Sequence, residues 1–168
     1  EIVHLTHTLT GHEGALRSVA FTPDGEWLVS SSMDRTLRVW ARNGQCHRVL
    51  TGHTAPAEWL AISPCAIDGR LSMASCDQDQ QLRIWDFASG APVHLWHEPK
   101  GRILNLRYSP DGKLLAGATL DGYIQLWDVQ TGALVRTIEI AKPYAGMDVT
   151  GVSGITATQK AVPRGPGA

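Results

Sequence analysis

The chain has 168 residues, 43% of them hydrophobic and 18% charged, which is the composition of a folded globular protein and not of a disordered one. Its 15 Lys and Arg residues nearly balance its 16 Asp and Glu residues, so it lacks the excess positive charge with which a protein attracts nucleic acid. No stretch approaches the roughly 20 apolar residues that cross a bilayer, and we expect a cytoplasmic protein without a membrane partner.

The first predicted element is a single strand over residues 2–9, in the run "VHLTHTL". We interpret it as the outer strand of a sheet whose other strands lie upstream or in another chain.

The next stretch divides into four short runs of β-strand type, separated by turn signals. These runs are "LRSVAF", "EWLVSSS", "TLRVWA" and "CHRVLT", and Asp-Gly or Asn-Gly stands in several of the breaks. Hardly any helical period occurs in the chain, so the predicted class is all-β.

The same pattern then returns twice. In each copy an Asp stands six residues before a Trp, and "FTPDG", "ISPCAIDG" or "YSPDG" stands upstream. Trp40, Trp85 and Trp127 are 45 and 42 residues apart, within the range expected for one blade of a β-propeller. We predict three four-stranded blades, over residues 11–51, 52–96 and 97–140, and an irregular or disordered tail over residues 141–168.

The middle copy is the longest. Its distance from Pro64 to Trp85 exceeds the corresponding distance in the other two copies by four residues. We assign three of the additional residues to the turn "PCAIDG" and one to the segment "ASCDQD".

These landmarks resemble the WD40 repeat family, whose members form β-propellers. "TGH" occurs at residues 10–12 and 51–53, "WD" is intact at residues 85–86 and 127–128, and Ala follows the Trp of the first copy. The resemblance covers residues 4–140. It implies a partial propeller, whose blades are apolar on both faces because each one stacks between two neighbours.

The resemblance also implies a polar network in each blade. In the first blade, the Asp34 carboxylate accepts a hydrogen bond from the His12 ring. The ring meets a hydroxyl, of Ser30 or Ser32, that contacts the Trp40 indole. A closed network of this kind satisfies buried polar groups. The corresponding residues are His53, Ser75, Asp79 and Trp85 in the second blade, and Thr119, Asp121 and Trp127 in the third, where no His is aligned.

A Ser, a His and an Asp in contact are also the catalytic set of a hydrolase. Nucleophilic catalysis needs one activated Ser beside an oxyanion hole, whereas this set recurs at Trp40 and at Trp85, and the chain has no Gly-x-Ser-x-Gly elbow. We therefore expect a protein without catalytic activity.

No cofactor or metal site is expected. Cys46, Cys65 and Cys76 are odd in number and include no Cys-x-x-Cys pair, so we expect reduced cysteines without a disulfide framework or a zinc site. His94 and His97 are three residues apart on an apparent strand and therefore point to opposite faces, which does not suit metal binding.

Three blades are too few to close a ring, since propellers use about four to eight. Two hypotheses stay open: the chain is a piece of a larger propeller, or it self-associates so that two copies complete a ring. Either arrangement leaves one apolar face at each end of the isolated arc, and such faces promote association.

The segment "PYAGMDVTGVSGITATQKA" in the tail is similar to the ends of bacterial signalling NTPases that carry a C-terminal WD40 propeller as a sensor. This similarity implies an alternative function, as the regulatory end of an NTPase whose catalytic domain lies upstream.

The WD40 resemblance implies a non-catalytic scaffold or sensor module with a protein or peptide partner. The contact residues are expected in the loops before the first strand of each blade and in the turns before the Trp strand. Trp59 is interpreted either as an anchor for the partner or as packed against the next blade. The candidates are Met33, Arg35, Glu58, Trp59, Gln78, Lys100, Arg102 and Leu120.

Overall fold

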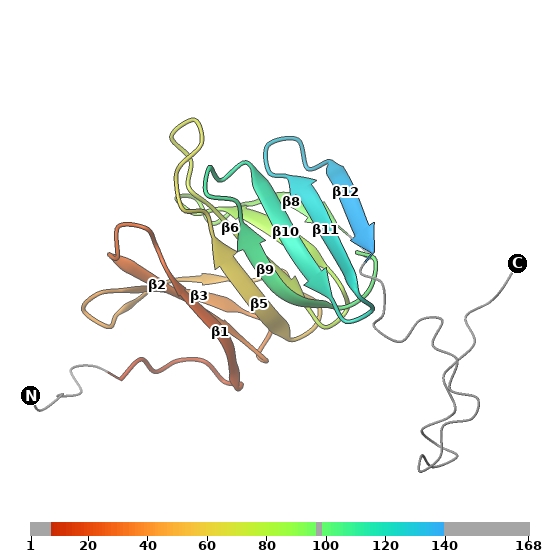
Figure 1. Ribbon diagram of the computed structural model, residues 1–168. Helices are drawn as coiled ribbons and strands as arrows, with labels where there is room; N and C mark the ends of the chain where they lie inside the picture. Colours follow the sequence, from red (N-terminus) through yellow and green to blue (C-terminus); the bar gives the residue numbers. More distant parts are fainter. Residues whose placement is uncertain (1–7, 97–98, 140–168) are drawn as a thin grey trace, which may run out of the picture.

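The computed structural model describes residues 8–96 and 99–139, which form three antiparallel sheets of four strands each (Figure 1). The first sheet contains β1 (Leu16–Phe21), β2 (Trp27–Ser32), β3 (Leu37–Ala41) and β4 (Cys46–Leu50). The second contains β5 (Ala57–Ile62), β6 (Ser72–Asp77), β7 (Leu82–Asp86) and β8 (Pro92–Trp96). The third contains β9 (Ile103–Tyr108), β10 (Leu114–Thr119), β11 (Tyr123–Asp128) and β12 (Leu134–Glu139).

Each sheet pairs its strands in chain order, because each connection is a turn that returns the chain beside the strand it has just left. In the turns after β1 and β9, Gly25 and Gly112 both have a φ of 71°, a left-handed conformation that favours glycine. The Asp before each of them accepts a hydrogen bond from the Thr22 or Ser109 hydroxyl. These contacts explain why Pro-Asp-Gly recurs in the sequence.

The four additional residues of the middle blade all lie between β5 and β6, where the chain forms a small extra hairpin. The assignment of one of them to "ASCDQD" is wrong. Ser30 lies opposite Arg38 and Ser75 lies opposite Arg83, so the strands that lead to the Trp have the same register in both blades.

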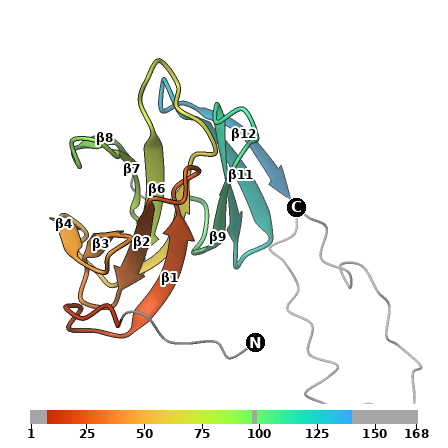
Figure 2. The ribbon, with the colours of Figure 1, turned by 90° about the vertical axis from the view of Figure 1, so that its left-hand side faces the viewer.

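The core consists of two apolar layers, one between each pair of neighbouring sheets. The first strands, β1, β5 and β9, contact one another in sequence near the centre of the molecule, while β4, β8 and β12 lie at its periphery (Figure 2). Burying one Leu or Ile in such a layer contributes about 1.5–3 kcal/mol. Three stacked blades around a common line confirm the predicted all-β fold, a partial propeller.

Several expectations concern other parts of the chain. The tail over residues 141–168 lies outside the described residues, as does the leading strand over residues 2–9 apart from its last two positions, which are not in a strand.

Within the described segments, no helix is long and apolar enough to cross a membrane. Cys46, Cys65 and Cys76 are free thiols, and burial in β6 raises the pKa of Cys76 to about 12.

Candidate functional site

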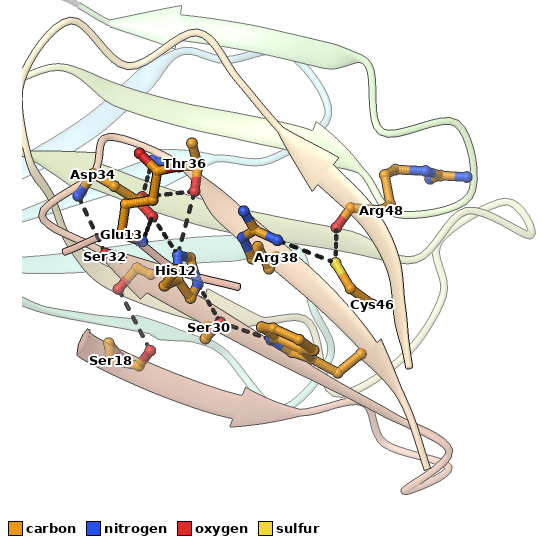
Figure 3. Close-up of polar contacts among 12 residues, drawn as sticks. His12, Glu13, Ser18, Ser30, Ser32, Asp34, Thr36, Arg38, Cys46 and Arg48 are labelled. Carbon is orange, nitrogen blue, oxygen red and sulfur yellow. Dashed lines mark hydrogen bonds and ion pairs between the residues drawn. The ribbon is translucent and has the colours of Figure 1, made fainter. Parts of the chain in front are cut away.

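A chain of hydrogen bonds runs from Trp40 to Asp34 in the first blade. Figure 3 shows its part from Ser30 through His12 to Asp34. Trp40 Nε1 donates to Ser30 Oγ at 2.8 Å. The His12 ring lies between Ser30 Oγ and Asp34 Oδ2, 2.7 Å from each. Because a carboxylate only accepts, the His12 Nδ1 proton is donated to Asp34, and Nε2 accepts from Ser30. The Ser32 hydroxyl instead accepts from the Asp34 backbone N–H at 3.2 Å, so Ser30 is the serine of this network.

Asp34 is held by several donors. Its carboxylate accepts from the Thr36 hydroxyl at 2.6 Å and from the backbone N–H groups of Thr36 and Glu13 at 2.9 and 3.0 Å. Burial acts to raise the pKa of Asp34, but the bonds from Thr36, His12 and the backbone outweigh it and hold the pKa far below its ordinary value. The carboxylate is therefore ionised and fixes the loop before β1 against the turn after β2.

The second blade has the same network with a different carboxylate. Trp85 Nε1 donates to Ser75 Oγ at 2.8 Å, and Ser75 Oγ is 2.7 Å from His53 Nε2. His53 Nδ1 then lies 2.9 Å from Asp77 Oδ2. The assignment of Asp79 to this place is wrong, since Asp79 lies exposed in the turn after β6.

The reason lies in the period of a strand. Asp77 is the last residue of β6, and its side chain projects to the same side of the sheet as Ser75, two residues earlier. Burial acts to raise the pKa of Asp77, but the His53 bond lowers it below its ordinary value. The signal that could have identified Asp77 was the Ser-x-Asp alternation within the strand, which the six-residue spacing from Asp to Trp concealed.

Within residues 99–139, the third blade has no such chain of bonds at this position. Gly117 occupies the place of the network serine, and a Cβ there would lie 2.8 Å from the Trp127 indole. Thr119 lies two residues beyond Gly117 and so corresponds to Ser32, not to Ser30. Its hydroxyl accepts from the Tyr123 backbone N–H at 3.1 Å, and its expected role as the hydroxyl beside Trp127 is wrong. Asp121 lies exposed in the turn that follows β10.

The geometry of the Ser-His-Asp sets favours a structural role. Both network serines, Ser30 and Ser75, are buried, and each Oγ already holds an indole donor and a His ring. A substrate carbonyl therefore has no path to either oxygen, as nucleophilic attack requires.

The loops at one end of the arc are joined in the same way in all three blades. The backbone N–H of the residue after the second strand donates to the carbonyl of the residue just before the first strand. Because this bond repeats, the turn before each Trp strand and the loop before each first strand meet at one surface. The three bonds are Met33 to Ala15 (2.9 Å), Gln78 to Pro56 (3.1 Å) and Leu120 to Arg102 (2.8 Å).

Six of the eight candidate contact residues are exposed at this end, which we call the loop surface. Two of them are large apolar side chains, and the Lys100 ammonium lies 4.0 Å from the centre of the Tyr123 ring. The loop surface comprises Met33, Arg35, Gln78, Lys100, Arg102 and Leu120.

The expectation that Glu58 is a loop residue is wrong. It lies in β5 with only 1% of its surface exposed, and its carboxylate accepts two hydrogen bonds from the Arg102 guanidinium. Gln78 Nε2 donates to it at 3.2 Å and Arg17 Nη2 at 3.4 Å. Burial acts to raise the pKa of Glu58, but Arg102 and Gln78 lower it overall. This Glu58 cluster connects all three blades beneath the loop surface.

Trp59 also lies in β5 and not in a loop. It is half-buried and packs against the apolar layer between the second and third blades, which favours packing over the anchor interpretation. Trp59 also lines a groove of about 400 Å³ along the first strands, together with Asn105 and Tyr108.

Comparison with known proteins agrees with this architecture. A family model described as "WD domain, G-beta repeat" matches residues 3–41 and 44–86, and one described as "Anaphase-promoting complex subunit 4 WD40 domain" matches residues 80–156.

Similar proteins include nuclear distribution protein nudF of Aspergillus niger, which is 31% identical over 79% of the chain. Periodic tryptophan protein 2 of Arabidopsis thaliana is 36% identical over 77%, and transcription initiation factor TFIID subunit 5 of Caenorhabditis elegans is 32% identical over 76%. The matched part covers 30%, 14% and 19% of these relatives, respectively. With three blades that follow the repeat in the sequence, the chain belongs to the WD40 repeat family.

Proposed function

We propose that the chain is a non-catalytic scaffold that binds a protein or peptide partner through the loop surface. The observation that carries this proposal is the repeated backbone bond at one end of the arc, which brings three equivalent positions, Met33, Gln78 and Leu120, to one exposed surface. Two of the three are apolar and stand beside charged side chains, a combination found where a few anchors contribute most of the binding energy.

The Glu58 cluster supports this role because it makes the loop surface rigid. Arg102 belongs to the loop surface, and its guanidinium is fixed by a carboxylate in the neighbouring blade. A preorganised surface loses less conformational freedom on binding than a mobile one. A scaffold of this kind needs neither a cofactor nor a metal ion.

Membership of the WD40 family supports a binding module over a hydrolase. The alternative role at the regulatory end of a bacterial signalling NTPase belongs to the same class, because it too requires binding. Its support is the sequence of the tail, outside the described residues. A cytoplasmic location stays part of the proposal.

A peptide display selection against the purified chain tests the binding role. Selected peptides are then measured against the double variant Met33→Glu/Leu120→Glu and against Val49→Glu, an apolar position on β4 that is about as exposed as Met33. We expect at least tenfold weaker binding to the double variant and unchanged binding to Val49→Glu. Peptides that bind the double variant as tightly as the unchanged chain would refute the assignment of the loop surface.

A further inference from the structure

The contacts between neighbouring blades always join opposite sides of the two sheets. Each blade has a Trp side, which carries the Trp of its third strand, and a reverse side. The Trp side of the second blade packs on the reverse side of the first. The contact joins Leu60, Met73 and Trp85 to Val29, Leu37, Val39 and Leu50.

The contact between the second and third blades repeats this pairing with other residues. The Trp side of the third blade packs on the reverse side of the second. The contact joins Leu106, Leu115 and Trp127 to Ala74, Leu82 and Ile84. Two independent contacts of one kind define which side of a blade fits which side of its neighbour.

The Trp side of the first blade is apolar in the same way, and although Trp40 itself is buried, the residues of its first strand β1 on that side are exposed. Val19, Leu60 and Leu106 are equivalent, since each lies opposite the position of the network serine in the next strand. Their exposed fractions are 57%, 4% and 0%, respectively. Phe21, two residues after Val19 and on the same side of β1, is 67% exposed. This side therefore has the composition of an interface without a blade packed on it.

The reverse side of the third blade is the matching surface. Ile124 pairs with Ile138 across β11 and β12, as Leu37 pairs with Leu50 across β3 and β4. Leu50 is 5% exposed because a blade covers it, whereas Ile138 is 38% exposed. The neighbouring Leu126 is likewise only half-buried.

Among the described residues, 8–96 and 99–139, one Trp side and one reverse side thus have no blade packed on them, and these are the two kinds of surface that pack together twice within the chain. We propose that a second copy of the chain packs its first blade against the third blade of the first copy, head to tail. The contact is heterologous, so it joins two different surfaces and leads to a closed ring or to an open chain of copies. Burial of the exposed apolar surface is the driving force.

Two variants test this pairing, because each blocks one surface at a side chain that is already exposed. Phe21→Glu places a charge on the first blade, and Ile138→Glu places one on the third. Val93→Glu, at an exposed position of β8 in the middle blade, is the matched control. Molar mass is measured by light scattering over a concentration series, and circular dichroism checks that each variant is folded.

We expect the molar mass of the unchanged chain and of Val93→Glu to rise with concentration, from the mass of one chain to that of two or more. Each end variant should associate at least tenfold more weakly. An equimolar mixture of the two end variants should form a two-chain species, because Phe21→Glu keeps its third blade and Ile138→Glu keeps its first. That species separates head-to-tail pairing from symmetric pairing of like surfaces.

Three results would contradict the head-to-tail pairing. A single-chain mass for the unchanged protein at every concentration would overturn the proposal and assign the two end surfaces to other blades. So would undiminished association of both end variants, or an equimolar mixture that stays at the mass of one chain.

Discussion

His53 Nδ1 lies 2.9 Å from Asp77 Oδ2, although Asp79 has the sequence spacing that Asp34 has in the first blade. A carboxylate can therefore reach the equivalent His ring from two backbone positions, the last residue of the second strand or the turn beyond it. In both blades the buried His ring is satisfied by hydrogen bonds, but the Asp that accepts from it stands at a different position in each blade.

This relationship predicts a difference in stability between two neighbouring substitutions. Asp77→Ala leaves the buried His53 Nδ1–H without its acceptor and should cost about 1–3 kcal/mol. Asp79→Ala, at an exposed position, should change the free energy of unfolding by about 0.5 kcal/mol or less. Urea denaturation of both variants measures the difference, and a larger loss for Asp79→Ala would contradict the assignment.

The first and third blades should also respond differently. Asp34 accepts bonds from His12, Thr36 and the backbone, whereas Asp121 is exposed. We expect Asp34→Ala to lower the thermal midpoint more than Asp121→Ala does. Equal shifts in differential scanning calorimetry would argue against the network as a source of stability.

The two network carboxylates should make the stability depend on pH in the acid range. The folded-state pKa values of Asp34 and Asp77 are lowered, while an unfolded Asp has a pKa of about 3.9. The unfolded state therefore binds more protons as the pH falls, so this stabilisation is complete above about pH 5 and is lost towards lower pH. The free energy of unfolding should fall less steeply between pH 5 and pH 3 in Asp34→Asn/Asp77→Asn, and an unchanged slope would refute this.

The Glu58 cluster predicts unequal roles for its two arginines. Arg102 makes two hydrogen bonds to the buried carboxylate, whereas Arg17 makes one at 3.4 Å. Arg102→Ala should cost about 1–3 kcal/mol because it removes charge-assisted bonds to a buried group. Arg17→Ala should cost less than about 1 kcal/mol. Chemical denaturation distinguishes the two, and similar losses would mean that the cluster is not organised around Arg102.

A side chain at position 117, where the first blade has Ser30, should destabilise the third blade. A Cβ at this position meets the buried Trp127 indole at 2.8 Å, and overpacking of this kind costs about 1–3 kcal/mol. We expect Gly117→Ala and Gly117→Ser to lower the thermal midpoint, while Ala118→Ser, at the next and exposed position, has little effect. A stabilised Gly117→Ser variant would show that the Trp127 indole can move and donate its N–H to the new hydroxyl.

The sequence predicts the architecture well because strand alternation and turn residues are local signals. The predicted runs "LRSVAF" and "CHRVLT" correspond to β1 and β4 within one residue, and Trp40, Trp85 and Trp127 each lie in a third strand. Such signals depend on residues that are close together in the sequence, so they can be recognised within a single copy of the repeat.

The polar contacts depend on long-range geometry and are harder to predict. The sequence predicts a loop at Glu58, but β5 begins one residue earlier, at Ala57. The partner of Glu58, Arg102, lies 44 residues away in the chain. Whether Asp77 or Asp79 accepts from His53 depends on where β6 ends. The sequence spacing from Asp to Trp does not determine this. The role of Gly117 cannot be inferred from the sequence, because it depends on the Trp127 indole, which fills the space that a side chain would occupy.

In the proposed function, the partner binds the loop surface. Amide hydrogen exchange of the chain with and without a saturating selected peptide measures this most directly. We expect slower exchange in the turns after β2, β6 and β10, around Met33, Gln78 and Leu120, with little change at the opposite turns near Gly25 and Gly112. Protection confined to those opposite turns, or to the outer strands β4, β8 and β12, would contradict it.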